Sequence, residues 1–91
     1  MAKAIHFFTG HCSYGRPQDY AQRADGAWFY REYAFNGYAK AWTRWEMLPK
    51  SMWRNLDQCL AEMVGDRLNY GFTPLRRIEG APVRLPNASV Q

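Results

Sequence analysis

Two glycine-containing dipeptides, Asp25-Gly26 and Asn36-Gly37, constrain the fold of this chain more than any other feature of its sequence. Each supplies the positive φ angles that a two-residue type I′ turn requires, and each is flanked by alternating apolar and polar side chains. Together they predict a three-stranded antiparallel meander, rich in the Tyr, Trp and Phe residues that strands favour. Its strands would be residues 18–24, 27–35 and 38–47.

The segments that flank the meander have simpler patterns. Residues 3–9 mix β-branched and aromatic side chains and stop at Gly10, which predicts a short strand. After Pro49, apolar residues recur at steps of three and four, and this period predicts one α-helix over about residues 51–66. The prolines that follow leave room for one short C-terminal edge strand at about residues 75–79.

The predicted fold class is therefore α+β: an antiparallel β-meander of three to four strands packed on one α-helix. A chain of 91 residues has the size of one domain, and its 47% hydrophobic content is unlike that of disordered proteins. We expect residues 1–80 to form a single small domain. We expect residues 81–91 to be an irregular C-terminal tail.

If both turns hold two residues, the register of the meander is fixed, and the side chains that share a face can be named. One face would combine cations with aromatic rings. Its cross-strand pairs would be Phe35 with Tyr38, Tyr33 with Lys40, Arg31 with Trp42 and Phe29 with Arg44, joined by Tyr20 and Gln22. The opposite face would carry Ala21, Ala34, Ala39 and Ala41, with Trp28, Tyr30, Trp45 and Met47 toward one end. Because small residues let a helix come close, we expect the helix to pack on this alanine face.

The aromatic and basic face is the candidate binding surface. Aromatic rings stack on nucleotide bases while cations meet phosphates, and the net charge of +4 favours an anionic partner. The sequence therefore predicts a non-enzymatic binding module that engages nucleic acid or a nucleoprotein complex. Its binding residues would be Tyr20, Phe29, Arg31, Tyr33, Tyr38, Lys40, Trp42 and Arg44, with Arg76 and Arg77 added if the C-terminal segment folds back along the sheet edge.

Two other interpretations of this face remain open. Tyr, Trp and Arg also anchor protein interfaces, so the chain is alternatively a small interaction protein of the phage or mobile-element type. Such a protein would inhibit a host complex through protein contacts, or would form a homodimer through the same face. The face would have no partner if it were a second core layer whose charged tips reach solvent.

Catalytic and metal-binding patterns are weak. A small RNA-cleaving toxin would need His6 or His11 as a general base, but the sequence has no paired catalytic carboxylates, P-loop or H-E-x-x-H motif. Adjacent His11 and Cys12 lack the second pair of ligands of a structural zinc site. Cys12 and Cys59 are expected to be reduced side chains that pack in the interior. We therefore expect no enzymatic activity, no cofactor and no metal.

The chain also lacks the patterns of membrane or secreted proteins. No apolar run approaches the roughly 20 residues of a membrane-spanning helix. The N-terminus lacks the basic segment and long apolar stretch of a secretory signal. We expect a cytoplasmic protein that does not act on a membrane.

Overall fold

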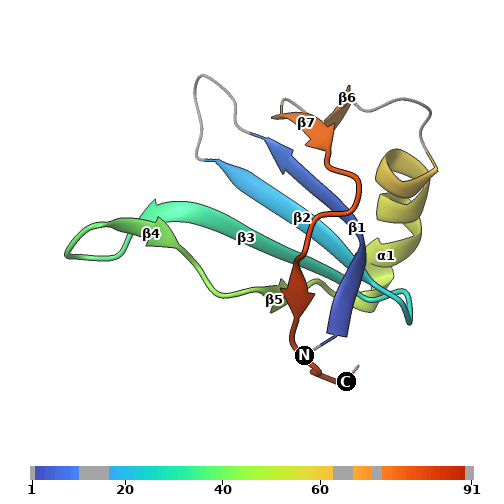
Figure 1. Cartoon of the computed structure of the whole chain (residues 1–91), viewed down its shortest axis with the longest axis horizontal. Coiled ribbons are helices and arrows are strands. Elements are labelled where there is room, and N and C mark those ends of the chain that lie inside the picture. Colours follow the sequence, from blue (N-terminus) through green and yellow to red (C-terminus); the bar gives the residue numbers. More distant parts are fainter. Residues whose placement is uncertain (1, 11–16, 63–66, 71–72, 90–91) are drawn as a thin grey trace.

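The structure is a computed structural model that describes residues 2–10, 17–62, 67–70 and 73–89, with only the backbone described for 67–70 and 73 (Figure 1). The described residues form an antiparallel sheet and one short helix, so the α+β class is confirmed. The strands are β1 (Ala2–Gly10), β2 (Gln18–Arg23), β3 (Trp28–Phe35), β4 (Lys40–Trp42), β5 (Glu46–Met47), β6 (Arg67–Tyr70), β7 (Thr73–Arg77) and β8 (Arg84–Leu85). The helix α1 spans Lys50–Leu56 and continues as a π-helical turn, Asp57–Ala61.

The sheet is larger than the three to four strands that the sequence predicts. Its strands lie in the order β4-β3-β2-β1-β7-β6, with β5 paired to β3 and β8 paired to β1. The strand β1 lies inside the sheet, between β2 on one side and β7 and β8 on the other. The C-terminal segments are therefore part of the sheet, because β1 offers them a free edge.

Two sequence predictions for the C-terminal half need correction. Residues 67–70, which follow the predicted helix and for which no strand is predicted, form β6. In the segment expected to be an irregular tail, β8 pairs with β1, and its Leu85 is fully buried. The Arg23 guanidinium also donates a hydrogen bond of 2.7 Å to the carbonyl of Pro86, which attaches this segment to β2.

The helix begins directly after Pro49 and buries Leu56 and Leu60 against the sheet. The Asp57 carboxylate accepts hydrogen bonds of 2.8 Å from both the Trp28 indole and the Gln22 amide. These bonds fix the helix on one sheet face, which we call the helix face. The described helical residues end at Ala61, so the predicted segment 63–66 lies outside the described residues.

The hairpin between β2 and β3 has a longer turn than predicted. Three residues, Ala24 to Gly26, connect the strands, because the Arg23 amide donates to the Ala27 carbonyl. Gly26 has a φ of 98°, which suits a type I turn closed by a glycine bulge. The extra residue shifts the register by one, and a shift of one moves every β2 side chain to the other face. Tyr20 and Gln22 consequently lie on the helix face opposite Tyr30 and Trp28, and Ala21 lies opposite Phe29.

The register of the hairpin between β3 and β4 also differs from the prediction, but by two residues. Phe35 pairs with Lys40, and the Asn36 amide donates to the Ala39 carbonyl, so the chain turns at Gly37 and Tyr38, one residue later than predicted. The Asn36 side-chain oxygen accepts hydrogen bonds from the amides of Tyr38 and Ala39, and these bonds stabilise the turn. A shift of two changes the predicted pairs, so that Tyr33 faces Trp42, but it leaves each side chain on its predicted face.

The face opposite the helix face carries Arg31, and we call it the Arg31 face. Around β3 and β4 it comprises Arg31, Tyr33, Phe35, Lys40 and Trp42, as cross-strand pairing and the alternation of strand side chains require. The pairing of Met47 with Phe29 shows one extra residue between β4 and β5. Met47 and Trp45 therefore join the Arg31 face, and the predicted pairing of Phe29 with Arg44 is wrong.

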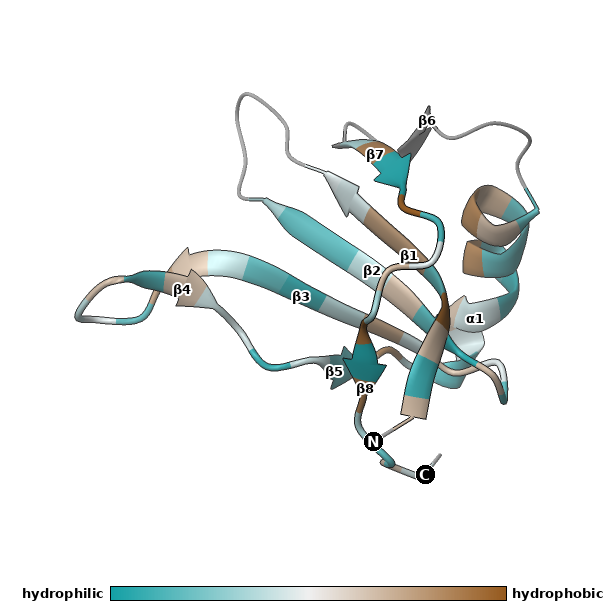
Figure 2. Ribbon diagram, viewed as in Figure 1, coloured by the Kyte–Doolittle hydropathy of each residue, from teal (hydrophilic) through white to brown (hydrophobic). Residues whose placement is uncertain are grey.

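Each face of the sheet has its own core cluster. On the helix face the cluster is Phe8, Trp28, Leu56, Leu60 and Leu75. On the Arg31 face the cluster is Ala4, Ala21, Ala27, Phe29 and Leu85. The apolar side of α1 meets the sheet beside β1 (Figure 2). The helix thus packs on the predicted side of β3, opposite Arg31, but it contacts the aromatic residues Phe8 and Trp28 there, whereas Ala21 lies on the Arg31 face. No helix of the described residues is long and apolar enough to cross a membrane.

Candidate binding surface

The connection from β3 to β5 extends away from α1 and forms one end of the molecule in Figure 1. We call residues 33–45 the arm. Its large side chains are exposed: Phe35 is 67% exposed, Tyr38 94% and Trp42 41%. Lys40 and Arg44 are exposed as well, and residues 33–45 contain no Asp or Glu. The arm therefore presents rings and positive charge without a carboxylate of its own.

The guanidinium of Arg31 lies at the base of the arm between two indoles. Its Cζ atom is 4.7 Å from the ring centroid of Trp42 and 4.5 Å from that of Trp45. These distances are those of cation–π contacts, which fix the orientation of both rings. The Tyr33 ring adds a further contact, with its centroid 5.6 Å from that of Trp42.

A buried carboxylate holds Arg31 in this position. Asp19 is 1% exposed and accepts a hydrogen bond of 2.7 Å from the Arg31 Nε. Its other oxygen accepts a bond of 2.6 Å from the Thr9 hydroxyl. Since Asp19 balances its charge, Arg31 serves to orient Trp42 and Trp45 and is not a free cation for a ligand phosphate.

Only part of the predicted binding residues lie together. Arg31, Tyr33, Lys40 and Trp42 share the Arg31 face, Tyr38 lies in the turn of the arm, and Arg44 follows β4. Arg76 is exposed on β7 and pairs with Thr9, which places it on the same sheet face, but β1 and β2 separate β7 from β3. The residues of β3, β4 and the arm form the candidate surface, and Arg76 lies away from it.

Three predicted residues lie elsewhere. Phe29 is fully buried in the core cluster of the Arg31 face. Tyr20 is on the helix face, with its ring 5.2 Å from that of Tyr30. Arg77 is also on the helix face, where it lies over the Phe8 ring and donates to the carbonyl of Leu60. None of these three side chains contributes to the exposed surface of the arm.

The structure adds residues that sequence analysis missed. Trp45 was assigned to the opposite face, because the irregular residues 43–45 between β4 and β5 have no pattern of their own. Asp19 was not considered, because the predicted two-residue turn pairs Arg31 with Tyr20, whereas the structure pairs it with Asp19. Phe35 was placed on the correct face but not chosen for the site, although its 67% exposure makes it prominent.

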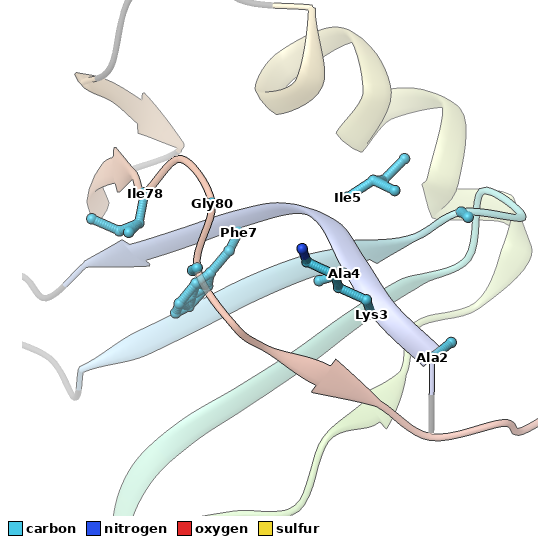
Figure 3. Close-up of a pocket in the computed structure, with 9 residues that line it drawn as sticks. Ala2, Lys3, Ala4, Ile5, Phe7, Ile78 and Gly80 are labelled. Carbon is cyan, nitrogen blue, oxygen red and sulfur yellow. The ribbon is translucent and has the colours of Figure 1, made fainter.

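A separate cavity of about 560 Å³ lies between β1 and the segment that leads from β7 to β8 (Figure 3). Its lining is mostly aliphatic and includes Ile5, Phe7 and Ile78, with Lys3 as its one charged residue. None of the predicted binding residues lines it. The cavity is therefore distinct from the arm.

The residues considered for catalysis or metal binding are dispersed. His6 is half-buried beside Phe8, and the half-buried thiol of Cys59 contacts the side-chain oxygen of Asn55 at 3.5 Å. His11 and Cys12 lie outside the described residues. Within the described part of the chain, no group of three or more His, Cys, Asp or Glu side chains could hold a metal ion.

Comparisons with protein-family models, curated proteins and solved structures find no match to this chain. The side chains of the arm offer two kinds of interaction to a ligand. Its exposed rings can stack on flat groups, and Lys40 and Arg44 can neutralise negative charge.

Proposed function

We propose that the protein is a non-enzymatic binding module whose arm engages nucleic acid, alone or in a nucleoprotein complex. The observation that carries this proposal is the combination of Phe35, Tyr38 and Trp42 in solvent with two exposed cations on one projecting hairpin. Rings stack on bases, and cations meet phosphates.

The exposure of these rings supports a binding role. Burying apolar surface stabilises a protein by about 25 cal/mol per Å², so a small domain gains by covering its large rings. The arm leaves three of them accessible, in contrast to Phe8, Trp28 and Phe29, which are fully buried. A cluster of exposed apolar residues on a small protein is typical of an interaction site.

The placement of charge favours an anionic ligand. Lys40, Arg44 and Arg76 are exposed. The carboxylates of Glu32 and Glu46, which flank the arm along the chain, lie on the helix face, and on the Arg31 face Asp19 binds Arg31. A phosphate that approaches the Arg31 face of the arm would therefore meet Lys40 without a carboxylate directly beside it.

The proposal is tested by titrating tryptophan fluorescence with mixed-sequence oligonucleotides at several salt concentrations. We expect quenching that weakens as salt rises, because released counterions contribute to binding. The slope of log K against log salt is negative, and the double variant Lys40→Ala/Arg44→Ala should reduce its magnitude by about 1.4 to 1.8. Each phosphate contact contributes about 0.7 on single strands and 0.9 on duplex DNA.

The matched control is Lys50→Ala/Arg54→Ala, which removes two exposed cations from α1 and should leave the salt slope unchanged. Equal effects of the two double variants would show that net charge, and not the arm, drives binding. Absence of quenching at every salt concentration would reject nucleic-acid binding. A salt-insensitive dimer in a mass measurement would then favour a protein interface.

A further inference from the structure

We infer that the ligand of the arm is single-stranded nucleic acid whose unpaired bases stack on Trp42, Phe35 and Tyr38. This inference rests on the proposed nucleic-acid binding and adds the strandedness of the ligand. Three observations carry it: the fixed orientation of Trp42, the separation of the rings, and the small number of free cations.

Trp42 is oriented before any ligand arrives. The Arg31 guanidinium and the Tyr33 ring contact it, with the Tyr33 ring tilted by 45°. The indole still keeps 41% of its surface exposed. A ring that is already fixed loses little conformational entropy when a base stacks on it, and this preorganisation favours binding.

The separation of the rings suits bases that are spread apart. Phe35 pairs with Lys40, and Trp42 pairs with Tyr33, so Phe35 and Trp42 are diagonal neighbours on one face. Such neighbours are about 7–8 Å apart. Successive bases in a duplex strand rise by only about 3.4 Å, and their faces are covered by the adjacent bases. Two rings in this arrangement therefore fit unstacked bases, and Lys40 beside Phe35 is placed to meet a phosphate of the same strand.

The balance of charge and rings also favours a single strand. About half to two-thirds of the hydrogen bonds in protein–DNA complexes go to phosphate and sugar. On the arm only Lys40 and Arg44 offer charge, because Arg31 is paired with Asp19. The exposed rings outnumber these cations, and rings bind base faces, which only unpaired nucleotides expose.

The test compares a labelled strand of about 12 nucleotides, a length within the site sizes of single-strand binding domains, with the same strand annealed to its complement. Fluorescence anisotropy at one fixed salt concentration gives both affinities. We expect the single strand to bind at least about tenfold more tightly. Trp42→Ala should weaken single-strand binding about 5- to 150-fold, the equivalent of one lost base stack, and should leave duplex binding unchanged.

Two further variants separate stacking from a structural role of Trp42. Trp42→Phe retains a ring and should keep most of the single-strand affinity, whereas Phe35→Ala should lose affinity without touching the Arg31 contacts. Met52→Ala removes an exposed apolar side chain from α1, with 37% exposure comparable to that of Trp42, and should bind like the wild type.

These measurements distinguish a preference for single strands from nucleic-acid binding in general. Equal or tighter binding of the duplex would overturn single-strand preference but would retain nucleic-acid binding. Failure to bind either probe would overturn both. Unchanged single-strand binding in Trp42→Ala and Phe35→Ala, with the wild type still bound, would show that the rings do not stack on bases.

Discussion

The two ends of β3 place aromatic residues in opposite environments. At its start, Trp28 and Phe29 are fully buried, one in each core cluster. At its end, Phe35 is 67% exposed and continues into the arm. The amino-acid types are alike, but α1 and the C-terminal segment cover only the first end. Coverage by other elements, and not ring content, therefore separates the core of this protein from its candidate binding surface.

The comparison between core and arm predicts a large difference in stability between two tryptophan variants. Trp28→Ala should lower the free energy of unfolding by about 3–5 kcal/mol, because it leaves a cavity and removes the hydrogen bond to Asp57. Trp42→Ala should lower it by about 1 kcal/mol or less, because the lost cation–π contact is partly exposed. Urea unfolding measures both values, and similar losses would mean that the arm is part of the core.

The pair of Asp19 and Arg31 connects the two regions, and its removal should have the next largest effect. Asp19→Ala leaves the Arg31 guanidinium without its carboxylate and should lower the free energy of unfolding by about 2–3 kcal/mol. It should also free the indoles of Trp42 and Trp45 to move, which fluorescence anisotropy decay would detect.

A double-mutant cycle separates the ion pair from the other contacts of Asp19. Asp19→Ala/Arg31→Ala should cost less than the sum of the single variants, since neither charge is then left without its partner. Thr9→Val removes only the hydroxyl bond to Asp19 and serves as the smaller, matched control. If the stability loss of the double variant equals the sum of the two single losses, Asp19 does not hold Arg31 between the two indoles.

The sequence predicted which side chains share a face more accurately in the arm than in the core. The difference comes from the register that each turn imposes on its strands. The second turn begins one residue later than predicted, which shifts the register by two and preserves the alternation, so Tyr33, Lys40 and Trp42 were assigned to the correct face. An error of one residue in the first turn reversed β2, so Tyr20 was assigned to the wrong face and Asp19 was overlooked. Both dipeptides marked turns, but a dipeptide does not determine at which residue the turn begins or how many residues it contains.

The remaining differences come from contacts between distant segments. Residues 67–70 follow a helical pattern and a glycine, which favours a helix end, yet they pair with β7. Leu85 lies among prolines, and only the free edge of β1 brings it into the core. The cavity beside β1 arises in the same way (Figure 3). Local periodicity contains none of this information, because tertiary pairing decides it.

The two hairpin turns give the smallest and most specific prediction, a difference in their dependence on pH. The turn between β2 and β3, which we call the core turn, is closed by an ion pair. The Arg23 guanidinium donates to both carboxylate oxygens of Asp25 at 2.7 Å and lowers the pKa of that carboxyl below its usual 3.8. The turn between β3 and β4, which we call the arm turn, is closed by the neutral side-chain amide of Asn36, whose oxygen accepts a hydrogen bond from the Tyr38 amide. Because Asp25 is 53% exposed, its ion pair should contribute less than about 1 kcal/mol.

The sign of this effect follows from the lowered pKa of Asp25. A carboxyl with a lower pKa in the folded state stabilises the fold above its usual pKa, and the contribution disappears as the pH falls through the folded value. Asp25→Asn should therefore be less stable than the wild type near neutral pH, and this difference should shrink below pH 3.8. The loss in Asn36→Ala should not change over the same range, because no charge is involved. Urea unfolding of each variant and of the wild type at the same pH gives the difference in free energy of unfolding, in which the titration of the other carboxylates cancels. If the loss in Asp25→Asn is the same at every pH, hydrogen-bond geometry, and not charge, closes the core turn.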